Sequence, residues 1–311
     1  MDFDWASLAL IAAIGFSCVQ IYLTYRRQVS LIKPAVEQLE TSRTNVETQI
    51  KESEENTEQI EKAISDLKRE LEVLDVTRAR LQEQLTDQEM VPIPAGEFRM
   101  GDDEGGTEEY PMHTVLLNAF MIDKFPVTNS QYKMFVDITG HRAPPHWTGG
   151  THTISEAEHP VVNVSWHDAQ AYAKWVNKRL PTEAEWEKAA RGTKGQTYPW
   201  GDAFRKDNTN CNNEYDGLTA VKQFPGGGSP YGVMDVCGNA CEWVEDWYFD
   251  DYYKSSPIDN PPGPDGGQYR VIRGGFFGEN KAGVRCAARH YSPPGAMQEH
   301  VGFRCAKTPD K

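Results

Sequence analysis

Hydrophobic and polar positions change their spacing twice along this chain, and the changes divide it into three segments. The first, WASLALIAAIGFSCVQIYLTY at residues 5–25, contains no charged residue. A helix of this length matches the ~30 Å core of a bilayer at ~1.5 Å per residue, with Trp5 and Tyr25 at its interfaces. We expect a single-pass membrane anchor over residues 1–27. A buried helix of a soluble core is the alternative.

The charges that flank this span predict its orientation. Asp2 and Asp4 precede it, whereas Arg26, Arg27 and Lys33 follow it. Because cytoplasmic flanks are enriched in Lys and Arg, the N-terminus is expected outside and the remaining chain in the cytoplasm. The acidic N-terminus, with no small-residue cleavage motif, argues against a cleaved signal peptide. A cytoplasmic C-terminal domain would lie in a reducing compartment.

The second segment, residues 28–89, has apolar positions at alternating steps of three and four. Of the fifteen a and d positions from Val36 to Leu85, eleven are apolar, and the positions between them are mostly charged or polar. This 3.5-residue period predicts a left-handed coiled coil, a rod of about 75 Å that would self-associate. The alternative is a single solvated helix with charge pairs four residues apart.

The third segment, residues 90–311, contains short alternating runs and many Gly, Pro, Trp and Tyr residues. Three capping boxes predict helices that begin after Thr128, Ser165 and Thr182. We expect an α+β domain with few helices and long loops. Ser165 lies in the phrase SWHD, but catalytic triads are assembled in space rather than within one helical turn, so we interpret Ser165 as a helix cap.

Composition excludes several classes of function. The net charge of −14 argues against nucleic acid, which requires a basic surface. Six scattered cysteines do not form the pattern of a disulfide-rich secreted scaffold. The chain contains no phosphate-binding loop, no dinucleotide-binding fingerprint and no HExxH motif.

The phrases of residues 90–307 follow an order that resembles the formylglycine-generating enzyme family, also called sulfatase-modifying factors. The phrases are MVPIPAGEFRMG, HPVVNVSWHDAQAYAKWVNKRLPTEAEWEKAARG, YGVMDVCGNACEWVEDWY, YRVIRGG and RCAAR…VGFRCA. The resemblance implies a C-type-lectin-related fold with little regular secondary structure. It says nothing about residues 1–89.

The resemblance also implies where copper would bind. Active members oxidise a peptide cysteine to formylglycine with copper held by two cysteines, shortly after a glycine pair that matches the pair ending at Gly275. Here FFGENKAGVR follows, and it contains no cysteine. Gly278 or Glu279 stands near one expected thiol position and Lys281 near the other, while Phe276 replaces the usual serine. We therefore expect neither copper nor the oxidase activity.

The remaining cysteines are expected to be reduced. Cys286 and Cys305 match cysteines that form disulfides in secreted members of the family, but Ala173 and Ala190 stand at the positions of their partners. This implies free thiols in the core. The pair within CGNAC, residues 237–241, is interpreted as buried thiols, because a zinc or redox site would need further ligands or a C-x-x-C spacing.

Two calcium sites are implied by the resemblance, each built from side-chain and carbonyl oxygens. The ligands of the first set are Asp235, Gly238, Ala240 and Glu242. The ligands of the second set, in a loop that looks abbreviated, are Asn210, Cys211, Asp216 and Leu218. For the first set, a glycine turn with an aspartate cap is the alternative.

The family's substrate cleft provides the remaining candidates. They are Phe276, Phe277, Glu279, His290, Tyr291 and His300. The loop between the two RC phrases could bind a ligand or a metal, or form a solvated loop. We expect a binding, scaffold or regulatory subunit with a peptide or protein partner. The alternatives are an oxidoreductase-like enzyme of this family with copper-thiolate-independent chemistry, and a lectin-like protein that displays a variable loop.

Overall fold

The computed structural model describes residues 26, 32–34, 36, 38–44, 57–85 and 89–309. The chain divides into two compact units, residues 1–84 and 85–311. The expected membrane anchor at residues 5–25 lies outside the described residues. Within the part that is described, no helix combines the length and the apolar character needed to span a bilayer.

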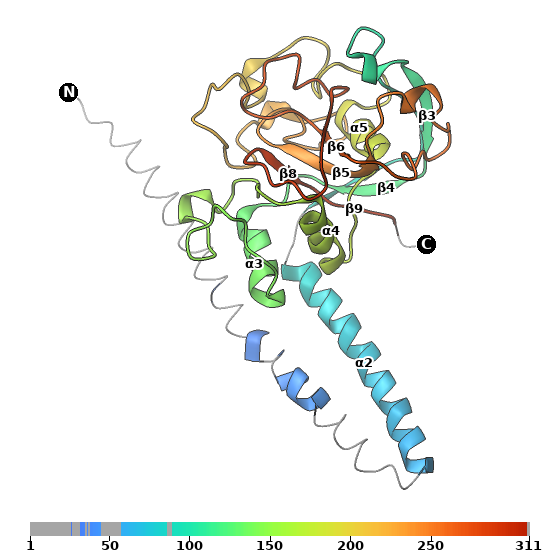
Figure 1. Ribbon diagram of the computed structural model, residues 1–311, viewed down its shortest axis with the longest axis vertical. Helices are drawn as coiled ribbons and strands as arrows, with labels where there is room; N and C mark the ends of the chain where they lie inside the picture. The colour runs from blue at the N-terminus through green and yellow to red at the C-terminus, as the bar shows by residue number, and fades with distance from the viewer. Residues whose placement is uncertain are drawn as a thin grey trace, which may run out of the picture. The chain divides into compact units, whose positions relative to one another are not determined.

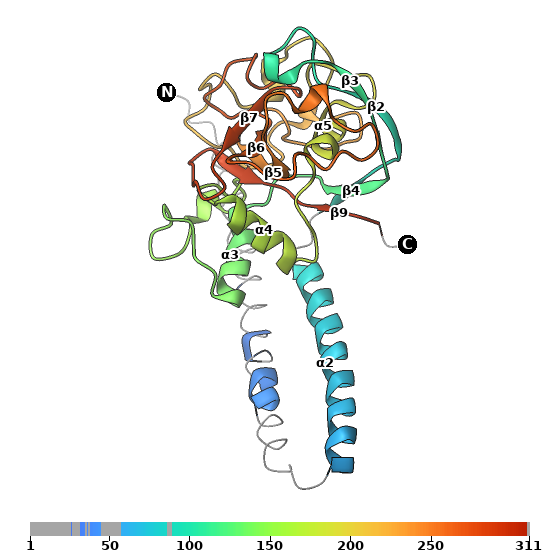
Figure 2. The same ribbon diagram turned by 45° about the vertical axis from the view of Figure 1, so that its right-hand side comes forward.

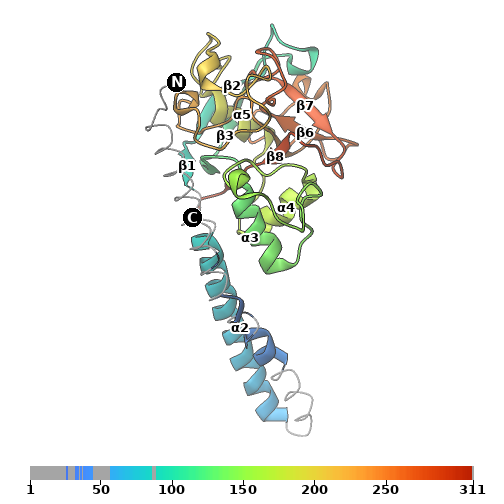
Figure 3. The same ribbon diagram turned by 90° about the vertical axis from the view of Figure 1, so that its left-hand side faces the viewer.

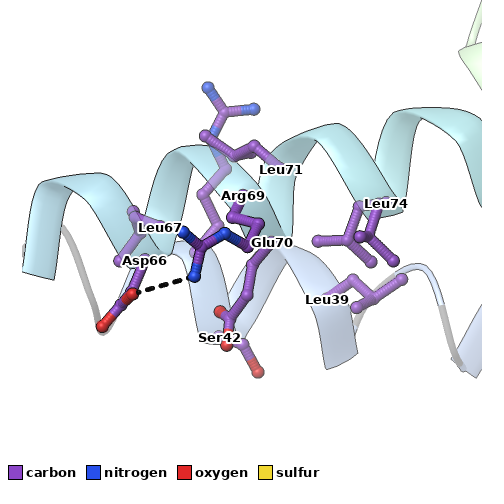
Figure 4. Close-up of a pocket in the computed structure, with 10 residues that line it drawn as sticks. Leu39, Ser42, Asp66, Leu67, Arg69, Glu70, Leu71 and Leu74 are labelled. Carbon is purple, nitrogen blue, oxygen red and sulfur yellow. Dashed lines mark ion pairs between the residues drawn. The ribbon is translucent and has the colours of Figure 1, made fainter.

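The first unit contains helical residues 38–44 and helix α2 (Thr57–Leu85). Leu39 and Leu74 lie on facing sides of one pocket of about 660 Å³ (Figure 4). A straight helix would separate these two residues by about 52 Å. The expectation of one uninterrupted rod is therefore wrong, since two helical segments lie side by side. The a and d residues Leu67, Leu71 and Leu74 of α2 are half-buried, and an intermolecular coiled coil remains a prediction.

The second unit, called the head below, contains short strands and helices joined by long loops (Figure 1). Its strands are β1 (Met90–Ile93), β2 (Gly96–Met100), β3 (His113–Leu117), β4 (Phe120–Asp123), β5 (Cys241–Trp247), β6 (Arg270–Arg273), β7 (Arg289–Ser292), β8 (Val301–Phe303) and β9 (Ala306–Lys307). Its α-helices are α3 (Asn129–Thr139), α4 (Trp166–Trp175) and α5 (Glu183–Arg191). Its 3-10 helices are η1 (Thr107–Glu109), η2 (Ile154–Glu156), η3 (Lys206–Asn208), η4 (Pro225–Gly227) and η5 (Tyr252–Lys254).

The strands form a four-stranded sheet in the order β7-β6-β5-β8, a three-stranded sheet β1-β4-β9 and the hairpin β2-β3. All pairings are antiparallel except β5 with β8. Helix α5 packs against β2, β3, β5 and β6, and helices α3 and α4 lie side by side (Figure 2). The α+β prediction with little regular structure is confirmed.

The three predicted helix starts are confirmed. Thr128, Ser165 and Thr182 are the N-caps of α3, α4 and α5, and each forms a complete capping box. The Ser165 hydroxyl accepts from the backbone N–H of Asp168 at 3.2 Å and donates to that residue's carboxylate at 2.6 Å. Ser165 therefore serves as a helix cap.

Buried ion pairs join helix α5 to the four-stranded sheet. Arg273 of β6 is fully buried and donates to Glu187 at 2.5 Å, while Arg289 of β7 binds Glu183 at 2.7 and 2.9 Å. Arg191 donates to the same Glu187 carboxylate at 2.9 Å. Because unpaired charges are very costly in a protein interior, these pairs position the start of the loop that follows β6.

Candidate functional site

The candidate site is built on the loop from the inner strand β6 to the edge strand β7 of the four-stranded sheet (Figure 3). Gly274 and Gly275 open the loop with φ of +98° and +68°, a region in which side chains are strained. A β-carbon on Gly275 would also lie 2.8 Å from the carbonyl oxygen of Gly283. The backbone at Gly275 and at Gly283 can therefore approach this closely only because glycine stands at position 275.

The carboxyl group of Glu279 lies between these glycines. A β-carbon on Gly283 would be 2.2 Å from Glu279 Oε2, and one on Gly275 would be 2.9 Å from the same atom. Oε2 is buried and accepts no hydrogen bond. Its ion-pair neighbour is His290 Nε2 at 3.5 Å, which is also 3.4 Å from the Gly283 carbonyl oxygen.

Burial sets the protonation of this pair. It raises the pKa of Glu279 from its ordinary value to about 7. Burial also lowers the pKa of His290, so the imidazole is neutral at neutral pH. The loop therefore holds an acid that titrates near physiological pH beside a neutral base.

The other expected cleft residues fall into two groups. Phe276 stacks on His300 with ring centroids 4.1 Å apart and meets Phe277 edge-on at 5.5 Å. Tyr291 instead stacks on Tyr248 at 4.3 Å. Neighbouring residues of a strand point to opposite faces, so Tyr291 lies on the other face of β7 from His290. The structure thus separates Tyr291 from the Glu279–His290 pair.

Comparison with known proteins decides the family. A family model described as "Sulfatase-modifying factor enzyme 1-like domain" matches residues 76–309. The chain belongs to this family. The formylglycine-generating enzyme of Thermomonospora curvata is 36% identical over 285 residues, which cover 71% of this chain and 93% of that protein.

Other relatives of this sulfatase-modifying-factor domain have different names. "Serine/threonine-protein kinase Pkn1" of Chlamydia trachomatis is 40% identical over 252 residues, 75% of this chain but 40% of that protein. The chain thus spans about two fifths of the chlamydial relatives. "Inactive C-alpha-formylglycine-generating enzyme 2" of Mus musculus is 32% identical over 281 residues, 71% and 86% of the two chains. The solved structure "Treponema denticola variable protein 1" has a TM-score of 0.62 at 25% sequence identity, and the match covers 71% of this chain and 95% of that protein.

The cysteines in the described part of this family member are buried and form no disulfides. The five in the described residues are free thiols. Burial raises the pKa of each; that of Cys286 rises to about 12. Ala173 and Ala190, at the places of the disulfide partners, are fully buried. The prediction of buried thiols is confirmed for the CGNAC pair and for Cys286 and Cys305.

The first calcium set fits Ca²⁺ poorly. Glu242 accepts from Arg304 Nε and Nη2 at 2.6 Å each, and from Trp186 Nε1 at 2.7 Å. The Asp235 carboxylate accepts from the backbone N–H of Lys222 at 3.2 Å, and burial raises its pKa to about 6. A guanidinium therefore already provides the positive charge that calcium would supply to Glu242.

The second calcium set fits better. Asn210 is fully buried, and its Nδ2 donates to Gly217 O at 2.9 Å and to Asn239 Oδ1 at 3.1 Å. Its Oδ1 is buried and accepts nothing. Since both amide hydrogens are used, the orientation of the amide is determined by its partners, and the orphaned oxygen is what a hard cation would bind. Asp216 is exposed and Leu218 half-buried on the same loop.

Sequence reasoning missed the role of the arginines in the RC phrases. Arg285 binds Glu109 at 2.8 and 2.6 Å and Asp102 at 3.0 Å. Arg304 binds Glu242, as described above. The signal was visible as an arginine before each cysteine, but the partners lie 176 and 62 residues away.

Proposed function

We propose that this protein is a membrane-anchored, self-associating member of the family that lacks cysteine oxidase activity and acts as a binding, scaffold or regulatory subunit. One observation carries the proposal. Gly278 or Glu279 and Lys281, rather than two thiols, stand where the resemblance places copper, and the five described cysteines are buried. Cu(I) requires soft, deprotonated sulfur ligands, which this loop does not supply.

The relatives support this direction without deciding it. A protein named as an inactive formylglycine-generating enzyme is among them. The chlamydial relatives are longer than the matched region, as expected of a domain that is combined with other parts. We propose that the surface around Phe276, Phe277 and His300 binds a peptide or protein partner.

Anchoring and assembly are further parts of the proposal. Residues 5–25 would anchor the chain with its N-terminus outside, and the head would lie in the cytoplasm. The half-buried leucines of α2 support self-association, because the pocket beside Leu39 and Leu74 leaves apolar surface accessible. The second calcium set would bind a structural Ca²⁺ through Asn210 Oδ1.

The test is a direct assay of oxidase activity. The full-length chain, purified in detergent, is incubated with a C-x-P-x-R peptide, a copper salt and oxygen, beside a formylglycine-generating enzyme as positive control. Mass spectrometry should show unchanged peptide cysteine with this chain and aldehyde with the control. Formation of formylglycine would refute the proposal.

A second candidate function is an enzyme of this family with copper-independent chemistry. The observation that favours it is the pair of Glu279 and His290, an acid and a base 3.5 Å apart with their side chains partly accessible. Such a pair can transfer protons at neutral pH. This alternative would be supported by catalytic turnover of a substrate that persists when copper is chelated and that the Glu279→Gln substitution abolishes.

A further inference from the structure

Three potential ligand atoms lie close together where the loop after β6 meets β7. Glu279 Oε2 lies 3.5 Å from His290 Nε2, and this nitrogen lies 3.4 Å from the carbonyl oxygen of Gly283. Oε2 is buried and accepts no hydrogen bond. Two acceptor oxygens therefore flank one imidazole nitrogen, and β-carbons at Gly275 and Gly283 would collide with the Glu279 carboxylate.

The distances of 3.5 and 3.4 Å from His290 Nε2 to the two oxygens match those between ligands of one metal ion. Zinc–nitrogen and zinc–oxygen bonds are about 2.1 Å, so two ligands at a tetrahedral angle are about 3.4 Å apart. We propose that Glu279 and His290, together with the Gly283 carbonyl group, bind a divalent transition-metal ion such as Zn²⁺. This proposal stands whether or not the head binds a peptide partner.

The donor set determines the class of metal. Imidazole and carboxylate ligands suit zinc and its first-row neighbours, whereas Cu(I) prefers thiolates and Ca²⁺ takes six to eight oxygens. No cluster of three or more His, Cys, Asp or Glu side chains able to hold a metal occurs in the described residues. The remaining coordination positions would thus belong to water or an incoming ligand. The side chains of His290 and Glu279 are 31% and 21% exposed, which leaves them access to solvent.

The bound state requires a particular protonation. His290 must carry its proton on Nδ1 so that Nε2 can bind the metal, and Glu279 must be ionised. Metal and proton compete for this carboxylate, so affinity should fall when acid protonates it. The other charged or titratable groups that act on the pair are Cys241, Arg273, Glu108 and Glu109.

The experiment is a calorimetric titration of the full-length chain in detergent with ZnCl₂, in millimolar CaCl₂ so that calcium sites are filled. We expect one zinc ion per chain. Glu279→Gln and His290→Gln should each weaken binding by more than about tenfold. The matched controls are Glu299→Gln and His167→Gln, both at exposed positions of the head, which should bind zinc like the wild type.

Cobalt provides a second measurement. Co²⁺ bound to mixed nitrogen and oxygen ligands should give visible absorption bands that Zn²⁺ displaces and that Glu279→Gln removes. Tryptophan fluorescence checks that each variant is folded. The proposal is overturned if the wild type binds no zinc, or if folded Glu279→Gln and His290→Gln bind it as tightly as the controls. A negative aldehyde assay has no bearing on either result, so the two proposals fail separately.

Discussion

Replacement of Glu242 by glutamine should strongly destabilise the head, whether or not calcium is present. Glu242 and Arg304 are 1% and 0% exposed, and two hydrogen bonds of 2.6 Å join them. Arg304 also donates to the carbonyl oxygens of Asp123, Lys124 and Met234 at 2.9–3.1 Å. This guanidinium therefore connects three segments of the chain, and Glu242 is the carboxylate with which it forms an ion pair.

The magnitude follows from the burial of the pair. Removing one partner of a buried ion pair leaves an uncompensated charge and costs about 3–5 kcal/mol. In Glu242→Gln the amide nitrogen would also face a guanidinium nitrogen, so two donors would oppose each other. With a urea m-value of ~2–3 kcal/mol/M, the unfolding midpoint should fall by roughly 1–2.5 M.

Urea unfolding followed by tryptophan fluorescence is a suitable assay, because Trp5 is the only one of the eight tryptophans outside the head. Glu299→Gln, at an exposed position, is the control and should be neutral. Measurements in EDTA and in CaCl₂ separate the two roles of Glu242. A loss below about 1 kcal/mol in EDTA would show that the structural reasoning is wrong, and a loss seen only with calcium would show that Glu242 is a calcium ligand.

Three further predictions concern the head. Calcium should raise the thermal midpoint of the wild type but not of Asn210→Ala, as scanning calorimetry with Ca²⁺ or EDTA can show. Iodoacetamide at pH 8 should leave Cys286 unmodified in the folded protein and modify it after denaturation, because burial raises the thiol's pKa to about 12; rapid labelling of the folded protein would contradict this. The folded-state pKa of Glu279 is raised to about 7, so the contribution of this group to the free energy of unfolding is full below pH 4.5 and is lost as the pH rises through 7. After solvent screening, this loss amounts to roughly 1–2 kcal/mol. Glu279→Gln should therefore be more stable than the wild type at pH 8 in EDTA but not at pH 4, and equal pH profiles in urea unfolding would contradict this.

The features that were predicted correctly from the sequence depend mainly on residues close together in the chain. The starts of α3, α4 and α5 follow from Thr128, Ser165 and Thr182, because a capping box involves residues only three positions apart. The apolar seam of α2 was likewise predicted, since its half-buried leucines repeat at heptad spacing. The predicted rod was wrong, because heptad spacing specifies which face of a helix is apolar but not which segment covers that face.

The two calcium sets illustrate what a motif match leaves out. All four residues of the first set are present in the sequence, yet Arg304, which binds the Glu242 carboxylate, lies 62 residues further on. The second set looked abbreviated in sequence, but it has the orphaned oxygen of Asn210. A motif match identifies the residues that could donate oxygen ligands to a metal. It does not show whether a charged side chain such as Arg304 already pairs with them, because that depends on tertiary contacts.

The loop after β6 extends this argument to function. A loop without thiols has little affinity for Cu(I), but its backbone can still bring other ligands together. Here Gly275 and Gly283 approach each other closely, and Gly278 or Glu279 stands near one of the thiol positions that the resemblance implies. His290 reaches this carboxylate from β7, in register with Ile272 of β6. Oxygen and nitrogen donors at this place favour a different class of metal from Cu(I), and the zinc titration tests whether they bind one.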